Sequence, residues 1–169
     1  MYTPGFRDGG TGPKEPAVAS IPESFMDIVN YVDSHYRTIK KREGRAVCGL
    51  SMGGGHTFHV SLLYPKTFDY YGLFSAGLHL ENGGYQDSFA KQIENSPSFA
   101  KQSAALFGSN PKLYWMGMGK TDFLYQSTVD LRNYWDSKGY KYEYVETDGG
   151  HIWRNWRIYL TMFAQKIFK

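Results

Sequence analysis

Residues 45–55 read Arg45-Ala46-Val47-Cys48-Gly49-Leu50-Ser51-Met52-Gly53-Gly54-Gly55, and this stretch says most about the fold. The segment 45–50 is short, mostly apolar and bounded by glycine, which is typical of a buried strand. A helical pattern begins at Gly53 and stops at Pro65. The stretch therefore predicts a buried strand, a sharp turn at Ser51 and a helix.

The turn carries the pattern G-x-S-x-G at residues 49–53. At a strand-to-helix junction, this pattern places a serine on a strained turn with its hydroxyl exposed, and small residues on either side let the chains pass. We expect Gly49 and Gly53 to provide that space. The backbone N–H of Met52, at the amino end of the helix, is the expected first donor to an oxyanion. A glycine-rich turn without chemistry is the alternative if the motif is taken alone.

The rest of the chain alternates between predicted strands and predicted helices. Strands are expected at residues 68–75, 113–118 and 140–146, and helices at residues 21–40, 98–107, 128–137 and 155–168. Ser20 is the expected cap of the first helix, with Pro22 in its first turn. This alternation indicates an α/β fold with a parallel sheet covered by helices on both faces. Residues 1–169 are predicted to form one domain, in which residues 1–20, rich in Gly and Pro, form a loop.

Two later strands end in residues that can complete a serine nucleophile. The strand 113–118 leads to Asp122, and the strand 140–146 leads through a glycine-rich loop to His151. Both positions lie just beyond the carboxyl end of a strand, where parallel sheets collect their ligands. A serine nucleophile needs a base to take its proton and an acid to orient that base. The chain order Ser51, Asp122, His151 is the order found in α/β-hydrolases.

Several residues compete for these roles. Asp148 lies only three residues before His151, although its Asp-Gly-Gly context favours a loop-shaping role. His56 and His59 have a spacing that could suit a metal, but a zinc site needs three or four ligands and no others cluster nearby. His79, after the second predicted strand, could border the site, whereas His35 is predicted at a surface or boundary position. The sequence therefore predicts no metal and no cofactor.

Composition narrows the classes of partner. The chain of 169 residues has a net charge of +3 and no long run of Lys or Arg, so neither nucleic acid nor a membrane surface is an expected partner. No segment approaches the roughly 18 to 20 apolar residues of a membrane helix. The start of the sequence lacks the regions of a secretory signal. The single cysteine, Cys48, excludes an intrachain disulfide and is predicted to be buried in its strand.

The motifs together resemble one family. They are Tyr36-Arg37-Thr38, Gly49-Leu50-Ser51-Met52-Gly53-Gly54-Gly55, Gly119-Lys120-Thr121-Asp122-Phe123 and Gly149-Gly150-His151-Ile152-Trp153. They resemble the esterase group of α/β-hydrolases that includes the feruloyl and acetyl-xylan esterases of carbohydrate esterase family 1 and esterase D-like proteins. The family usually has threonine where Ile152 stands. The resemblance implies that Ser51 is acylated, His151 shuttles the proton and Asp122 holds the imidazolium.

The resemblance runs from about Pro16 to the end and covers the carboxyl-terminal half of the family's fold. It implies further strands before the first helix and a second oxyanion donor on one of their loops, neither of which has an equivalent here. The strand 45–50 would then have an exposed edge, and such an edge invites pairing with another chain. We therefore expect either self-association or a longer gene product. The resemblance also suggests a secreted or periplasmic location, with the export route left open.

The leading functional hypothesis is a serine esterase that removes a feruloyl or acetyl group from plant cell-wall polysaccharide. Its partner would be an ester-bearing small molecule or an acylated polysaccharide, and Trp153 is a candidate wall of the acyl pocket. Esterases of the same fold that act on S-formylglutathione or siderophore esters are alternatives. A different alternative is a non-catalytic carbohydrate-binding or assembly module that retains a fossil triad.

Overall fold

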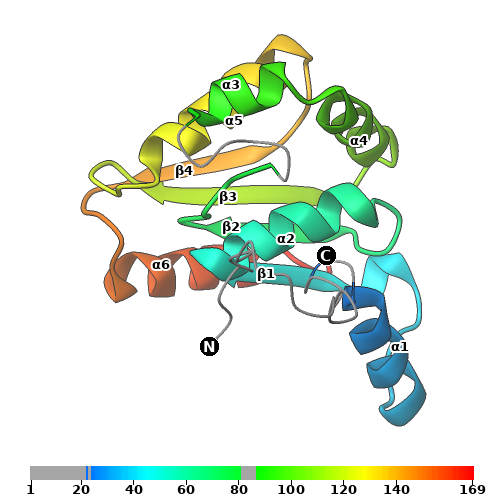
Figure 1. Cartoon of the computed structure of the whole chain (residues 1–169). Coiled ribbons are helices and arrows are strands. Elements are labelled where there is room, and N and C mark those ends of the chain that lie inside the picture. Colours follow the sequence, from blue (N-terminus) through cyan, green and yellow to red (C-terminus); the bar gives the residue numbers. More distant parts are fainter. Residues whose placement is uncertain (1–21, 23, 81–86) are drawn as a thin grey trace, which may run out of the picture.

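The computed structural model describes residues 22, 24–80 and 87–169. The predicted loop 1–20 and the predicted cap Ser20 lie outside these residues. The described part contains one sheet with four parallel strands in the order β1-β2-β3-β4 (Figure 1). The strands are β1 (Ala46–Leu50), β2 (Tyr70–Phe74), β3 (Leu113–Gly119) and β4 (Glu143–Thr147). The predicted α/β fold with a parallel sheet is confirmed.

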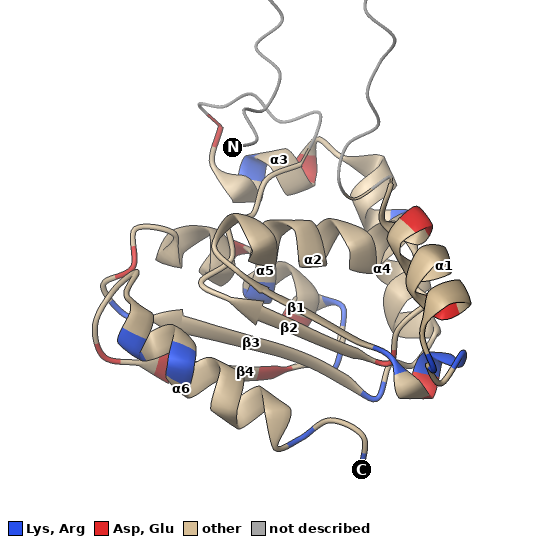
Figure 2. Ribbon diagram, turned by 90° about the horizontal axis from the view of Figure 1, so that it is seen from below, with Lys and Arg blue, Asp and Glu red and all other residues tan. Residues whose placement is uncertain are grey.

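Helices cover both faces of this sheet, as predicted. The α-helices of the described residues are α1 (Phe25–His35), α2 (Met52–Leu63), α3 (Phe89–Glu94), α4 (Pro97–Gly108), α5 (Tyr125–Ser137) and α6 (Trp153–Ala164). Neighbouring strands follow one another in the chain, so right-handed crossovers put all the helices between them on one face. Figure 2 shows α2, α4 and α5 on that face and α6 on the opposite one.

Aromatic side chains fill both interfaces between helices and sheet. On the α2 side, the core includes Phe58, Phe99 and Trp135, and on the α6 side it includes Trp115 and Phe163, each at most 2% exposed. Burying a side chain of this size contributes about 1.5 to 3 kcal/mol. Core packing therefore accounts for much of the chain's aromatic content.

The prediction of a buried first strand is wrong. β2 and β3 are buried along their whole length, but β1 is half-buried and Cys48 in its middle is exposed. In the described part of the chain, β1 pairs only with β2, so one edge of β1 has no neighbour. The apolar sequence of a strand does not reveal whether it lies at an edge or in the centre.

Several element boundaries also differ from the predictions. α1 begins at Phe25 after Ser24 rather than near residue 21, and α6 ends at Ala164. β4 begins at Glu143 rather than at Tyr140, and Tyr140 and Tyr142, which precede it, pack against the larger core. The short helix α3 was not predicted.

Of the two glycines predicted to provide space at the elbow, Gly49 has that role and Gly53 does not. A Cβ at position 49 would lie 2.2 Å from the Gly53 carbonyl oxygen, whereas one at position 53 would meet no described atom within 4 Å. Gly54 and Gly55, rather than Gly53, are the positions at which a side chain would collide with a neighbouring segment. A Cβ there would lie 2.8 Å from the Ala76 Cβ and 2.4 Å from the Gly77 carbonyl oxygen, respectively. These two glycines let α2 approach the segment after β2.

This difference gives a matched pair of variants. Gly49→Ala should destabilise the fold by about 1 to 3 kcal/mol, because the backbone of α2 must move. Gly53→Ala, at an open helical position, should stabilise it by up to about 1 kcal/mol. Urea unfolding followed by circular dichroism measures both. Equal effects of the two substitutions would contradict this assignment.

Candidate active site

The site is built around the turn between β1 and α2. Ser51 has φ 54° and ψ −119°, a conformation that non-glycine residues rarely adopt and that costs about 1 to 3 kcal/mol. Three backbone bonds hold it there. The Ser51 N–H donates to the Phe74 carbonyl at 2.9 Å, and the Ser51 carbonyl accepts from the N–H groups of Gly55 and Gly77 at 3.1 and 3.0 Å. The strained turn predicted from G-x-S-x-G is therefore present.

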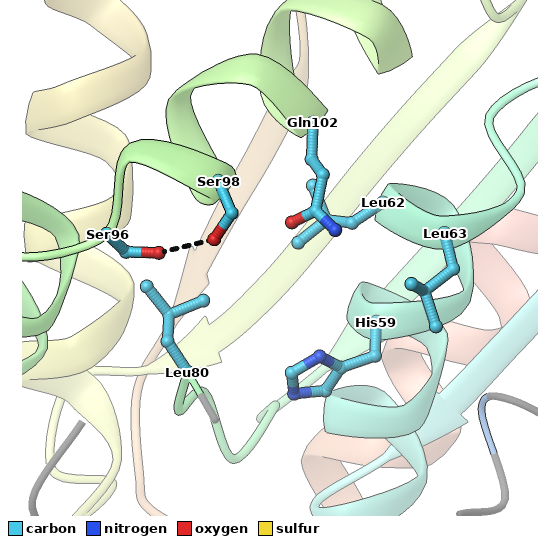
Figure 3. Close-up of a pocket in the computed structure, with 7 residues that line it drawn as sticks. All are labelled: His59, Leu62, Leu63, Leu80, Ser96, Ser98 and Gln102. Carbon is cyan, nitrogen blue, oxygen red and sulfur yellow. Dashed lines mark hydrogen bonds between the residues drawn. The ribbon is translucent and has the colours of Figure 1, made fainter. Parts of the chain in front are cut away.

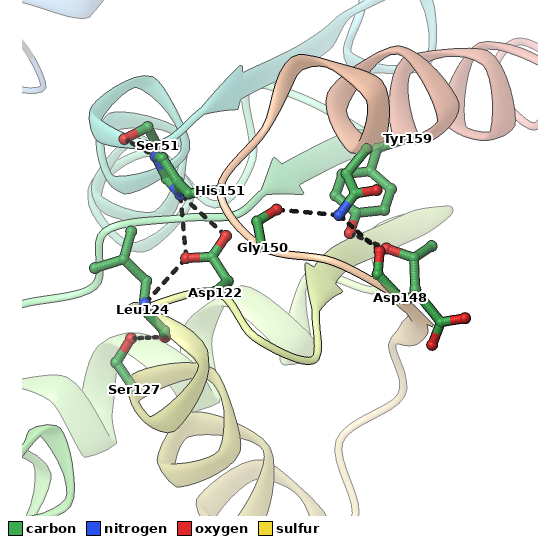
Figure 4. A network of polar contacts seen from close by, with 10 residues as sticks. Ser51, Asp122, Leu124, Ser127, Asp148, Gly150, His151 and Tyr159 are labelled. Atoms are coloured by element: carbon green, nitrogen blue, oxygen red, sulfur yellow. Dashed lines mark hydrogen bonds and ion pairs between the residues drawn. The ribbon is translucent and has the colours of Figure 1, made fainter.

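Hydrogen bonds connect Ser51, His151 and Asp122 (Figure 4). His151 Nε2 lies 2.9 Å from Ser51 Oγ, and His151 Nδ1 lies 3.1 and 3.0 Å from the two carboxylate oxygens of Asp122. With Nδ1 protonated, the imidazole donates to Asp122 and accepts from the Ser51 hydroxyl. The structure brings the three residues predicted from separate strands together in one chain of hydrogen bonds.

The environments of the two competing aspartates differ. The Asp122 side chain is fully buried and also accepts a hydrogen bond at 3.0 Å from the Leu124 N–H. The Asp148 side chain is 84% exposed and forms an ion pair with Lys120 at 3.0 Å. Asp122, rather than Asp148, is therefore the aspartate that contacts the His151 imidazole. Asp148 lies in the loop, as its sequence context indicated.

The loop that carries His151 is fastened to the loop that carries Asp122. The Lys120 N–H donates to the Thr147 carbonyl at 2.9 Å, and the Thr121 N–H donates to the Gly149 carbonyl at 3.1 Å. Gly149 has φ +87°, which only glycine adopts easily. The sequence did not single out a further group at this junction, the buried side chain of Asn155 on α6, because asparagine in a helix is usually at the surface.

Met52 is the first residue of α2, and its side chain is 53% exposed. The first N–H groups of a helix have no intrahelical partner, and they point towards the region in front of the amino end. The Met52 N–H is therefore available to an oxyanion that forms on a group bonded to Ser51 Oγ. Its role as a donor stays a prediction.

Aromatic side chains surround His151. The ring of Phe123 lies 4.7 Å from the imidazole between centroids, and the ring of Trp156 lies 4.9 Å from it, nearly perpendicular. Trp153 in turn contacts Trp156 edge-to-face at 5.1 Å. Phe123 is 76% exposed and Trp153 is 64% exposed. Phe123 and Trp156 thus contact the histidine, and Phe123 and Trp153 present large aromatic surfaces to solvent. We call these three residues, Phe123, Trp153 and Trp156, the aromatic rim.

A separate pocket of about 70 Å³ lies between α2 and the start of α4 (Figure 3). It is lined by His59, Leu62, Leu63, Leu80, Ser96, Ser98 and Gln102. His59 follows Ser51 by eight residues, which is about 12 Å along a helix. The pocket contains no triad residue, so it is not part of the candidate active site.

Of the remaining histidines, His35 is exposed at the end of α1, as predicted, and His59 lines this pocket. The His79 ring contacts the His59 ring edge-to-face at 5.0 Å. That His79 borders the candidate active site stays a prediction. Burial lowers the pKa of His59 to about 4, with further contributions from His79 and His56. Among the described residues, no group of three or more His, Cys, Asp or Glu could hold a metal ion. None of the described helices has both the length and the apolar character needed to cross a bilayer.

The parallel sheet, with a strained serine directly after β1 and a histidine after β4, is the arrangement of the α/β-hydrolase fold. A sequence comparison agrees with this class. The sequence profile of the Esterase family matches residues 26–167, and the chain belongs to this family.

Characterised relatives indicate what such proteins do. An acetyl esterase of Caldicellulosiruptor saccharolyticus is 29% identical over 158 residues, which cover 79% of this chain and 58% of that protein. An endo-1,4-beta-xylanase/feruloyl esterase of Xylanibacter ruminicola is 26% identical over 147 residues, which cover 85% of this chain and 17% of that protein. The chain thus spans little more than half of the first relative and one part of the second.

A solved structure supports the fold. The S-formylglutathione hydrolase of Staphylococcus aureus superposes with a TM-score of 0.66 at 23% identity, over 84% of this chain and 58% of that protein. At this level of identity the similarity concerns the fold.

Proposed function

We propose that this chain is a serine carboxylic-ester hydrolase that works by acyl transfer through Ser51, His151 and Asp122. The observation that carries the proposal is the continuous chain of hydrogen bonds from Ser51 Oγ through His151 to Asp122. Membership of the Esterase family supports it.

The first half-reaction acylates the serine. Ser51 Oγ attacks the carbonyl carbon of the ester while His151 Nε2 takes its proton, and Asp122 stabilises the imidazolium that forms. The Met52 N–H donates to the oxygen that becomes negatively charged. The imidazolium then gives its proton to the departing alkoxide, which leaves as an alcohol.

The second half-reaction releases the acid. Water attacks the acyl carbonyl while His151 Nε2 takes a proton from it, and the Ser51 alkoxide leaves and is reprotonated by the imidazolium. Because the alcohol leaves before water attacks the covalent acyl-enzyme, the kinetics are ping-pong.

The proposed substrate is a feruloyl or acetyl ester on plant cell-wall polysaccharide. Acetyl esterase and xylanase/feruloyl esterase are the activities named for the two relatives. The aromatic rim adds support, because exposed aromatic faces bind phenolic rings and sugars. Comparing turnover of methyl ferulate, acetylated xylan and S-formylglutathione tests this choice. Preference for the glutathione thioester would assign a different substrate, and absence of turnover together with no fluorophosphonate labelling of Ser51 would favour the non-catalytic binding module.

Trp153 should contribute to selection of an aromatic acyl group. Trp153→Ala is expected to lower kcat/KM for methyl ferulate about tenfold, because a ring contact of about 1.4 kcal/mol is lost. Turnover of p-nitrophenyl acetate should stay close to that of the unchanged chain. Tyr36→Ala is the matched control, because Tyr36 is equally exposed at 64% but follows α1, which carries no residue of the aromatic rim. Equal losses for both esters would contradict a role in selection.

The edge of β1 that has no strand beside it among the described residues is proposed to pair with another strand, for which a second copy of the chain is one source. The exposed apolar residues Ile28 and Tyr31 of α1 support this proposal. Sedimentation velocity should show association that increases with concentration. Cys48→Glu, which places a charge on the edge, should weaken it. A monomer at all concentrations would contradict self-association.

A further inference from the structure

Asn155 is a fully buried polar side chain that the proposed mechanism does not use. It lies in the first turn of α6, four residues after His151. Its Nδ2 donates two hydrogen bonds, to the Asp148 carbonyl at 3.1 Å and to the Gly150 carbonyl at 3.0 Å. Asn155 therefore holds the backbone of the loop that presents His151.

The same amide lies against the start of the acid loop. A Cβ at Gly119 would lie 2.9 Å from Asn155 Nδ2 and 2.3 Å from the Gly149 carbonyl oxygen. Gly119 is the last residue of β3, three residues before Asp122. Asn155 thus sits where the loop of the base and the loop of the acid meet.

The hydrogen bonding of the Asn155 side-chain amide is incomplete, so it does not by itself explain why position 155 is an asparagine. Asn155 Oδ1 is buried and has no hydrogen-bond partner among the described residues. A buried polar atom without a partner is destabilising, and an apolar side chain of similar size would avoid that penalty. Both N–H groups of the amide, in contrast, point at the histidine loop. Asn155 therefore acts as a hydrogen-bond donor to the loop that presents His151.

We infer that Asn155 is a positioning residue of the reaction, which sets the place of His151 between Ser51 and Asp122 by holding the carbonyl groups of residues 148 and 150. The inference rests on the proposed esterase function. His151 must satisfy hydrogen bonds at both ring nitrogens at once, and a displacement of about 1 Å can lower the rate by about 100-fold.

The test compares Asn155→Leu with the unchanged chain. The substitution keeps the volume and removes both donors. For p-nitrophenyl acetate, we expect kcat to fall about 10- to 100-fold while KM changes by less than about threefold. A second measurement does not depend on turnover. In the proton NMR spectrum, the low-field resonance of the His151 Nδ1–H that is bonded to Asp122 should shift or disappear.

The control is Phe163→Leu on the same helix. Phe163 is 2% exposed and packs on the sheet near Trp115, away from the loops. This variant should lower thermal stability but keep kcat and the low-field resonance. A structural role alone would make Asn155→Leu behave in the same way.

The outcomes are distinguishable. If Asn155→Leu is folded and retains both kcat and the resonance, the inference is overturned. Asn155→Asp places an acceptor towards the two carbonyl groups, so it should lose at least as much of kcat and of the low-field resonance. If Asn155→Leu does not fold, Asn155→Asp tests the inference by the same criteria. If the unchanged chain shows the resonance but hydrolyses no ester, the proposed function fails, whereas loss of the resonance in Asn155→Leu still supports the positioning role.

Discussion

Replacing Ser51 by alanine should lower kcat for ester hydrolysis by at least about 10⁴-fold, because no other group can form the acyl intermediate. Alanine has nearly the same backbone preferences and volume, so the strained turn and the fold should be kept. Hydrolysis of p-nitrophenyl acetate and labelling by a fluorophosphonate measure the effect. The low rate that remains should reflect binding and the Met52 N–H alone.

Ser127→Ala is the control for this experiment. The Ser127 hydroxyl lies in the same neighbourhood but donates to the Leu124 carbonyl at 2.8 Å and has no part in the proposed chemistry (Figure 4). It should keep both hydrolysis and labelling. Full ester hydrolysis by a folded Ser51→Ala protein would end the proposal that Ser51 is the nucleophile.

Asp122→Asn should have the second largest effect, a fall in kcat of about 10⁴-fold. The amide has the same shape as the carboxylate, but it carries no charge to stabilise the imidazolium and can favour the wrong tautomer of His151. Substrate binding does not involve this buried group, so KM should change little. Steady-state kinetics on p-nitrophenyl acetate separate kcat from KM.

Asp148→Asn provides the comparison, because Asp148 is the other aspartate near His151. It is exposed and contacts Lys120 rather than the imidazole, so its substitution should leave kcat close to that of the unchanged chain. Equal losses in the two variants would mean that the charge of the loop, rather than the orienting hydrogen bond, matters.

Much of the fold could be predicted because each βα unit is encoded locally. The strand before Ser51 and the strand before Asp122 each combine a short apolar run with a following glycine-rich turn, and the structure has both strands within about one residue of the prediction. The three triad positions could be predicted for the same reason, since each follows its own strand. Which aspartate contacts His151 depended on three-dimensional geometry, although the turn context of Asp148 favoured the correct choice.

The features that were missed depend on neighbours distant in sequence. Whether the strand with Cys48 is buried depends on the presence of another strand beside it, which its own residues do not encode. The space around Gly54 and Gly55 depends on the segment after β2. Asn155 has no local signal, because its hydrogen bonds go to a loop whose path is visible only in the folded chain.

The separation of Ser51 and His151 along the chain has a consequence for folding kinetics. The two residues are 100 positions apart, and they follow the two edge strands β1 and β4. Their side chains meet only when all three strand pairings of the sheet have formed. Contacts between such distant residues form slowly, because a long loop must close first. The hydrogen bond between the histidine and the serine is therefore a late event, and its appearance during refolding marks chains in which the whole sheet is complete.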